Sequence, residues 1–197
     1  MINIFYLSEL ILYFTIYSFL GWLLEVVYMS YQCKKLVNRG FLFGPFCPIY
    51  GFGVLLLIVS LSPISSSPLL FFIGAIAITS SLEYLTGFIL EKIFKTNWWD
   101  YSNEKYNLDG KICLKFSIYW GFLSLVLFYF IHPTINSLTT KILNFSSFYL
   151  PFILVIYFTV DLVLSIISVA HLQQHIKNQK HRLFKAFPHV KLSKYFK

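Results

Sequence analysis

Two glutamates of this chain stand in strongly apolar stretches, within two copies of one short motif. Residues 21–25 read GWLLE and residues 87–91 read GFILE, so Glu25 and Glu91 hold the same place in each copy. An acidic side chain at the centre of a membrane helix costs about 3 kcal/mol on insertion scales, and such residues serve binding, proton transfer or ion pairing. We therefore take Glu25 and Glu91 as candidate substrate-binding residues.

Further acidic residues follow helical spacing in the same kind of apolar stretch. Glu83 precedes Glu91 by two helical turns and shares its face, and Asp161 precedes Ser165 by one turn. Lipid offers no hydrogen-bond partner, so such faces turn toward the inside of a helix bundle. We expect Glu25, Glu83, Glu91 and Asp161 to line a polar cavity that opens to the cytoplasm. The alternative is that these acids only form internal ion pairs.

The segment after the first apolar stretch combines polar residues with helix breakers. Asn38 and Arg39 precede an apolar run over 41–50 that is rich in glycine and proline. Such a run does not continue a helix, so a re-entrant or interfacial segment is expected beside the polar faces. Arg39 is expected to pair with Glu25 or Glu83, or to bind an anionic headgroup. A positive-inside arginine without a partner is the alternative.

A second polar segment begins with two tryptophans and an aspartate, Trp98-Trp99-Asp100. Tryptophans of this kind anchor at the level of lipid headgroups. Asp100 is a candidate for substrate binding, and a structural role as a helix cap is equally open.

The elements that position these residues are apolar segments long enough to cross a membrane. Hydrophobic residues make up 57% of the 197 positions and charged residues 12%, which fits no soluble domain. About 20 residues cross a hydrocarbon core of roughly 30 Å as a helix. The sequence therefore predicts an all-α, polytopic membrane bundle of five transmembrane helices, of which the second is the weakest. These helices cover 4–29, 46–61, 69–94, 112–131 and 148–171.

Basic residues set the expected orientation. Of the 16 lysines and arginines, all but Lys141 fall on one side of this topology. Basic residues near helix ends stay in the cytoplasm, which places the N-terminus outside and the C-terminus inside. The net charge of +8 then faces anionic lipid, so membrane lipid is an expected partner and nucleic acid is not.

The two motifs suggest that a two-helix hairpin is duplicated. Hairpin 4–61 and hairpin 69–131 would run parallel to each other, with the fifth helix outside the repeat. Together they form a transmembrane domain over 1–171, followed by a basic cytoplasmic tail over 172–197. A repeat of this kind often encloses a substrate site on its axis. Chance similarity between two helix ends is the alternative.

A larger set of motif residues runs from the first apolar segment to His132-Pro133. These residues are Tyr17–Trp22, Glu25, Asn38–Leu42, Gly44-Pro45, Cys47–Gly51, Glu83-Tyr84, Glu91, Trp98–Ser102, Asn107, Gly110, Cys113-Leu114, Ser117, Trp120-Gly121 and His132-Pro133. As a set they resemble the putative ABC-transporter permease family (type IV) of small bacterial membrane proteins, with Lys111 in place of an expected arginine. The resemblance implies a multi-pass protein of the bacterial cytoplasmic membrane with a role in transport. It implies no catalytic residue.

Three functions remain open from the residues themselves. The first is a permease-type subunit that binds substrate in the acidic cavity; since the chain has no P-loop, an ATPase or other membrane protein would be its partner. Five helices are few for a pore, so a homodimer is also expected. The second is a membrane enzyme acting on a lipid or polyprenyl substrate, for which no nucleophile with a neighbouring base is visible. The third is a non-catalytic partner or chaperone. No cofactor or metal motif is present.

Overall fold

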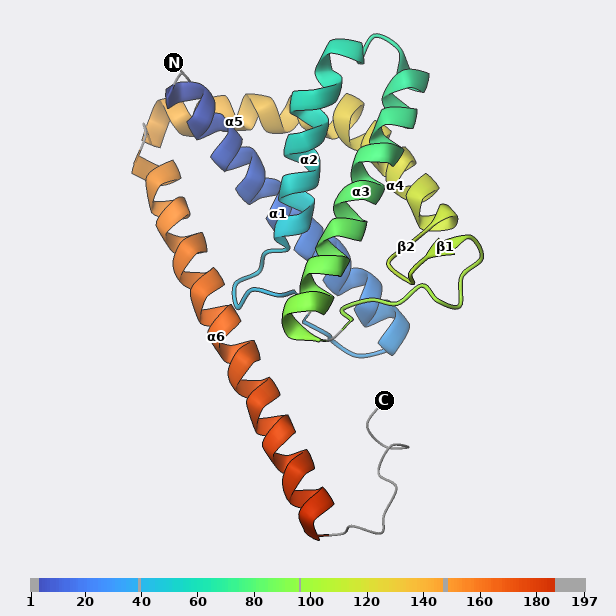
Figure 1. The fold of residues 1–197 in the computed structure, drawn as a ribbon. Helices are drawn as coiled ribbons and strands as arrows, with labels where there is room; N and C mark the ends of the chain where they lie inside the picture. The colour runs from blue at the N-terminus through green and yellow to red at the C-terminus, as the bar shows by residue number, and fades with distance from the viewer. Residues whose placement is uncertain (1–3, 39, 96, 147–148, 187–197) are drawn as a thin grey trace.

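The computed structural model describes residues 4–38, 40–95, 97–146 and 149–186 (Figure 1). The regular secondary structure of the described chain is helical apart from one short β-hairpin. In chain order the elements are α1 (Ile4–Cys33), α2 (Pro48–Leu61), the 3-10 turn η1 (Ser62–Ile64), α3 (Pro68–Phe94), β1 (Asn107–Leu108), β2 (Ile112–Cys113), α4 (Leu114–Val126), the π-helical turn η2 (Leu127–Ile131), α5 (His132–Ser146) and α6 (Tyr149–Ala186).

Four helical stretches of the described chain are long and apolar enough to span a membrane. They are Ile4–Cys33, Pro68–Phe94, Leu114–Ser146 and Tyr149–Leu172. The expected all-helical membrane fold is therefore confirmed at this level. The predicted segment 46–61 also forms a helix, but the 14 residues of α2 reach only about 21 Å, which is less than a hydrocarbon core.

Proline residues mark where two of these helices begin, and glycine residues allow neighbouring helices to pack closely. Pro48 and Pro68 each stand in the first turn of a helix, where the missing N–H costs nothing. Gly51 of α2 lies directly against α1, and Gly121 of α4 lies directly against α3, so that a Cβ on either would overlap its neighbours. The two helix pairs α1–α2 and α3–α4 thus pack at backbone distance.

The chain between α1 and α2 turns back into the bundle. Figure 1 shows it leaving the far end of α1 and returning to the lower end of α2, partway along α1. The N–H of Cys47 donates to the carbonyl of Ser18 at 2.9 Å, which fixes this return point in the middle of α1. The segment expected to be re-entrant therefore does return along α1.

Helix α5 replaces the loop expected after 131. It lies across the end of the bundle where α1 begins, beyond the π-helical turn (Figure 1). Two side-chain contacts hold it there: the Tyr13 hydroxyl donates to Asn136 at 2.6 Å, and the Tyr17 hydroxyl contacts Nδ1 of His132 at 3.0 Å. Helix α6 then runs along one side of the bundle and extends past it (Figure 1).

Candidate functional site

Glu25 is held by a tyrosine of the neighbouring helix. The Tyr50 hydroxyl, in the first turn of α2, donates to Oε1 of Glu25 at 2.8 Å. Tyr50 can approach α1 this closely because its ring packs directly on Gly21, one turn before Glu25. The return of the chain into the bundle therefore delivers a hydrogen-bond donor to the first glutamate.

Glu83 is a buried carboxyl group in the middle of the α3–α4 pair. Glu83 is only 8% exposed. The Tyr101 hydroxyl donates to Oε1 of Glu83 at 3.0 Å. The indole of Trp120, on α4, is a further donor beside the same carboxyl group. Its other oxygen, Oε2, is buried and has no hydrogen-bond partner among the described residues. A buried acceptor without a partner is costly, so Oε2 marks a point where a ligand group would be favourable.

Tyr101 reaches Glu83 from a surface segment. Its ring stacks on Phe116 of α4 with centroids 4.8 Å apart. Burial, and then the adjacent Glu83, raise the pKa of the Tyr101 hydroxyl well above its ordinary value. The hydroxyl therefore stays protonated at physiological pH and acts as a donor to Glu83.

An aromatic contact joins the two glutamates into one cluster. The rings of Tyr50 and Trp120 meet edge to face with centroids 5.8 Å apart, and the charge of Glu25 acts on Glu83. We call Glu25, Tyr50, Glu83, Tyr101 and Trp120 the polar centre. It lies where the α1–α2 pair meets the α3–α4 pair.

The contacts at the packed glycines match residues of α1 with residues of α3. This match differs from the one that the sequence motif gives. Gly51 packs on Phe14 and Ser18, and Gly121 packs on Phe72 and Ile76. Along the first helix of each pair, 58 positions separate Phe14 from Phe72 and Ser18 from Ile76, and the same 58 separate Glu25 from Glu83.

The second helix of each pair, α2 or α4, agrees with this match. The residue before each packed glycine is aromatic, Tyr50 in α2 and Trp120 in α4, and each lies beside the glutamate of its own pair. By contact, the counterpart of Glu25 is therefore Glu83. Whether the pairs arose by duplication stays a prediction.

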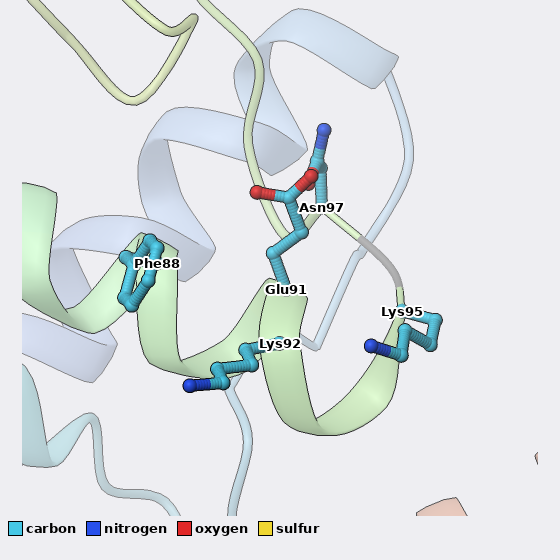
Figure 2. Close-up of a pocket in the computed structure, with 5 residues that line it drawn as sticks. All are labelled: Phe88, Glu91, Lys92, Lys95 and Asn97. Atoms are coloured by element: carbon cyan, nitrogen blue, oxygen red, sulfur yellow. The ribbon is translucent and has the colours of Figure 1, made fainter.

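Glu91 lies apart from the polar centre, in the last turn of α3. It forms an ion pair with Lys111 at 2.7 Å, and this pairing raises the pKa of the lysine. Glu91 lines a surface hollow of about 560 Å³. In Figure 2 its side chain points away from that of Lys92. The other lining residues are Phe88, Lys92, Lys95 and Asn97.

Asp161 binds the backbone of the returning chain. Its two carboxylate oxygens accept the N–H groups of Phe43 and Gly44, each at 2.9 Å, and Ser165 donates to Oδ1 at 3.3 Å. The residue is only 6% exposed. Asp161 thus anchors the segment that leads into α2, and through it positions Tyr50.

The remaining candidates lie in the two connecting segments. Asn38 accepts the indole N–H of Trp22 at 2.9 Å, whereas Arg39 lies outside the described residues. Asp100 accepts both the N–H and the hydroxyl of Ser102, at 2.9 and 2.5 Å, and these bonds lower its pKa. Asp100 therefore shapes the turn that carries Tyr101.

Gly110 completes that turn from the β-hairpin. The N–H of Tyr101 donates to the carbonyl of Gly110 at 2.7 Å. Gly110 has a φ of +65° and lies so close to Asp100 and Ser102 that a Cβ would overlap them. The motif at 98–102 and Gly110 thus position the hydroxyl group of Tyr101 at Glu83.

Sequence reasoning missed the aromatic members of the polar centre. Tyr50, Tyr101 and Trp120 all stand in the motif residues quoted above, but their type alone suggests packing or headgroup anchoring. Only the fold brings their donor groups and rings to the glutamates.

Comparison with known proteins gives a family for this chain. Residues 12–166 match the family described as "putative ABC-transporter type IV", a range that includes the polar centre and Asp161. Among curated proteins and among solved structures, none matches the chain. A membrane protein with four long apolar helices, the chain belongs to the putative ABC-transporter type IV family.

Proposed function

We propose that the protein is the membrane-spanning subunit of a transport system in the bacterial cytoplasmic membrane, and that the polar centre binds its substrate. Family membership supports the transport role, and the apolar helices support the membrane location. The observation that carries the substrate site is Glu83, whose buried Oε2 has no partner among the described residues. Buried polar atoms are nearly always satisfied, so an exception inside a membrane bundle supports a binding role.

In the proposed topology the chain crosses the membrane five times, and the second crossing is an interrupted helix. The returning segment 41–47 and α2 together would complete this crossing, since α2 alone is too short. Irregular backbone at membrane depth is tolerated where it is buried in protein, and Asp161 and Ser18 satisfy this segment. With the N-terminus outside, the Tyr101 segment and the polar centre face the cytoplasm.

An ATPase partner would supply the energy, because the chain has no P-loop. The β-hairpin segment is the candidate for its contact site, whereas the segment 41–47 is used inside the bundle. The hairpin is fastened by the Trp99 indole, which donates to the carbonyl of Lys111 at 2.8 Å, and by the Tyr84 hydroxyl, which donates to Asp109 at 2.8 Å. A rigid, exposed segment on the cytoplasmic side suits such a contact.

Copurification tests this proposal most broadly. The protein would be isolated from native membrane with its lipids and partners, and every bound small molecule and protein identified by mass spectrometry. The proposal expects a bound ligand that is lost in Glu25→Gln and Glu83→Gln, and retained in Glu104→Gln, which removes a half-buried acid of the loop that leads to β1. Glu104 pairs only with Lys115 at 3.1 Å among the described residues, so it serves as a matched control.

The same preparation separates transport from catalysis. A transport subunit returns its ligand unchanged, whereas an enzyme converts it. Chemical conversion of a lipid by the isolated protein, lost in only one of the two glutamate variants, would replace the transport proposal with the enzyme alternative, because a general base acts at a single reacting atom.

A further inference from the structure

We infer that the group recognised by the polar centre is a positively charged amine of the substrate; this inference rests on the proposed function and names its substrate class. The starting point is the buried carboxyl group of Glu83. It accepts hydrogen bonds from Tyr101 and Trp120, and both donors are neutral. The salt bridges Lys111–Glu91 and Lys115–Glu104 do not involve Glu83.

An ammonium group matches the open acceptor better than a neutral donor does. Hydrogen bonds between an ammonium and a carboxylate are shorter and about twice as strong as neutral ones. Oε2 of Glu83 can accept such a bond without displacing Tyr101, because Tyr101 donates to Oε1. The second carboxyl group of the centre, Glu25, acts electrostatically on Glu83.

The aromatic members of the centre favour the same kind of ligand. Tyr50 and Trp120 lie against each other, and Trp120 and Tyr101 lie beside Glu83. Aromatic rings attract cations through their faces, and tryptophan does so most strongly. Rings and carboxylates together form the usual environment of organic ammonium ions.

Other ligand classes fit less well. An anion would be repelled by the Glu83 carboxylate. A calcium ion requires six to eight oxygen ligands. Two carboxyl groups and two tyrosine hydroxyls would reach six only if every oxygen bound the ion, but here the two hydroxyls donate to Oε1 of Glu25 and of Glu83. Among the described residues, no group of three or more histidine, cysteine, aspartate or glutamate side chains is placed to hold a metal ion. An organic amine is the class that uses both the carboxyl groups and the rings.

A matched set of small probes tests the inference directly. Butylammonium, butanol and butyrate have the same carbon chain and differ in charge at pH 7. Their binding to purified protein in lipid nanodiscs would be measured by tryptophan fluorescence and calorimetry, with empty nanodiscs as the blank. We expect butylammonium to bind at least about tenfold more tightly than butanol, and butyrate not to bind, since about 1.4 kcal/mol corresponds to a factor of ten.

Substitution of single glutamates shows which residue binds butylammonium. Glu83→Gln should weaken butylammonium at least about tenfold and leave butanol unchanged, and Glu104→Gln should bind as wild type does. Equal binding of butylammonium and butanol, or full binding of the amine by Glu83→Gln, would overturn the inference. If Glu83→Gln does not fold, the comparison of the three probes on the wild-type protein decides alone.

Failure of this inference and failure of the proposed function give different results. A copurified ligand that depends on Glu83 but carries no amine would refute the amine and keep the polar centre as the site. Copurified ligands that all remain bound in both Glu25→Gln and Glu83→Gln would refute the centre itself.

Discussion

The hydroxyl of Tyr101 donates to Oε1 of Glu83 at 3.0 Å, and so connects a surface segment to a buried carboxyl group of α3. The segment is ordered for this purpose: Asp100 and Gly110 fix its turn, and Phe116 fixes the ring. The Tyr101 side chain thus links the polar centre to the β-hairpin segment.

Removal of that hydroxyl should destabilise the protein. In Tyr101→Phe the ring still stacks on Phe116, but the buried Glu83 carboxyl group loses the hydrogen bond that Tyr101 donates to its Oε1. A loss of about 1–3 kcal/mol is expected. Thermal unfolding in detergent measures it, with Tyr106→Phe as the control because Tyr106 is 82% exposed. Equal stability of the two variants would show that the Tyr101 bond contributes nothing.

The anchor at Asp161 should control the mobility of the returning segment. Asp161→Leu keeps the size of the side chain but removes both acceptors for Phe43 and Gly44. Bonds to a charged group contribute about 1.5–3 kcal/mol each, so the amides of residues 43–44 should exchange hydrogen at least about tenfold faster. The control is Thr159→Val on the same helix, where the exposed hydroxyl bonds only to the carbonyl of Val155. Unchanged exchange at residues 43–44 would contradict the anchor.

The packed glycines give a prediction about the two helix pairs. Gly51→Ala and Gly121→Ala should each cost about 1–3 kcal/mol, because the added methyl group overlaps the facing helix. Gly53→Ala is the matched control, since its methyl group would meet only Leu82 at an ordinary 3.5 Å. Thermal unfolding of the three variants checks the ranking; a Gly53→Ala protein as unstable as the others would argue against the close contacts.

The proposed orientation can be tested by labelling intact cells. Cysteines placed at Ser66 and Asn144 should react with a membrane-impermeant thiol reagent from outside, because both lie on the side with few basic residues. Native Cys33 is exposed in the structure but should not react, since it lies on the cytoplasmic side; Cys47 and Cys113 are buried. Labelling of Cys33 from outside would reverse the orientation and place the polar centre on the other side.

The helices were predictable because their signal is local. Apolar length alone identified the stretches that became α1, α3, α4 and α6, and the glycines and prolines identified the returning segment. Helix α5 was missed because His132-Pro133 reads as a helix end, whereas the helical stretch continues from α4 through the π-helical turn η2 into α5, with Pro133 directly after that turn.

The site was predicted only in part, because it depends on contacts between distant segments. Glu25 and Glu83 were recognised as acids in apolar helices, but the motif paired Glu25 with Glu91. In the structure Glu91 pairs with Lys111, whereas Glu83 contacts Tyr101 and Trp120. Helical spacing defines a face of one helix, and it does not tell which side chains of other segments meet that face.

The central claim is that Glu25 and Glu83, and not Glu91, form the substrate-binding centre. The most direct measurement is the binding of one ligand, butylammonium or the copurified molecule, to Glu25→Gln, Glu83→Gln and Glu91→Gln in nanodiscs. We predict at least about tenfold weaker binding in the first two variants and wild-type binding in Glu91→Gln, whose side chain is 44% exposed and paired with Lys111. Weakened binding in Glu91→Gln together with wild-type binding in Glu83→Gln would contradict the account.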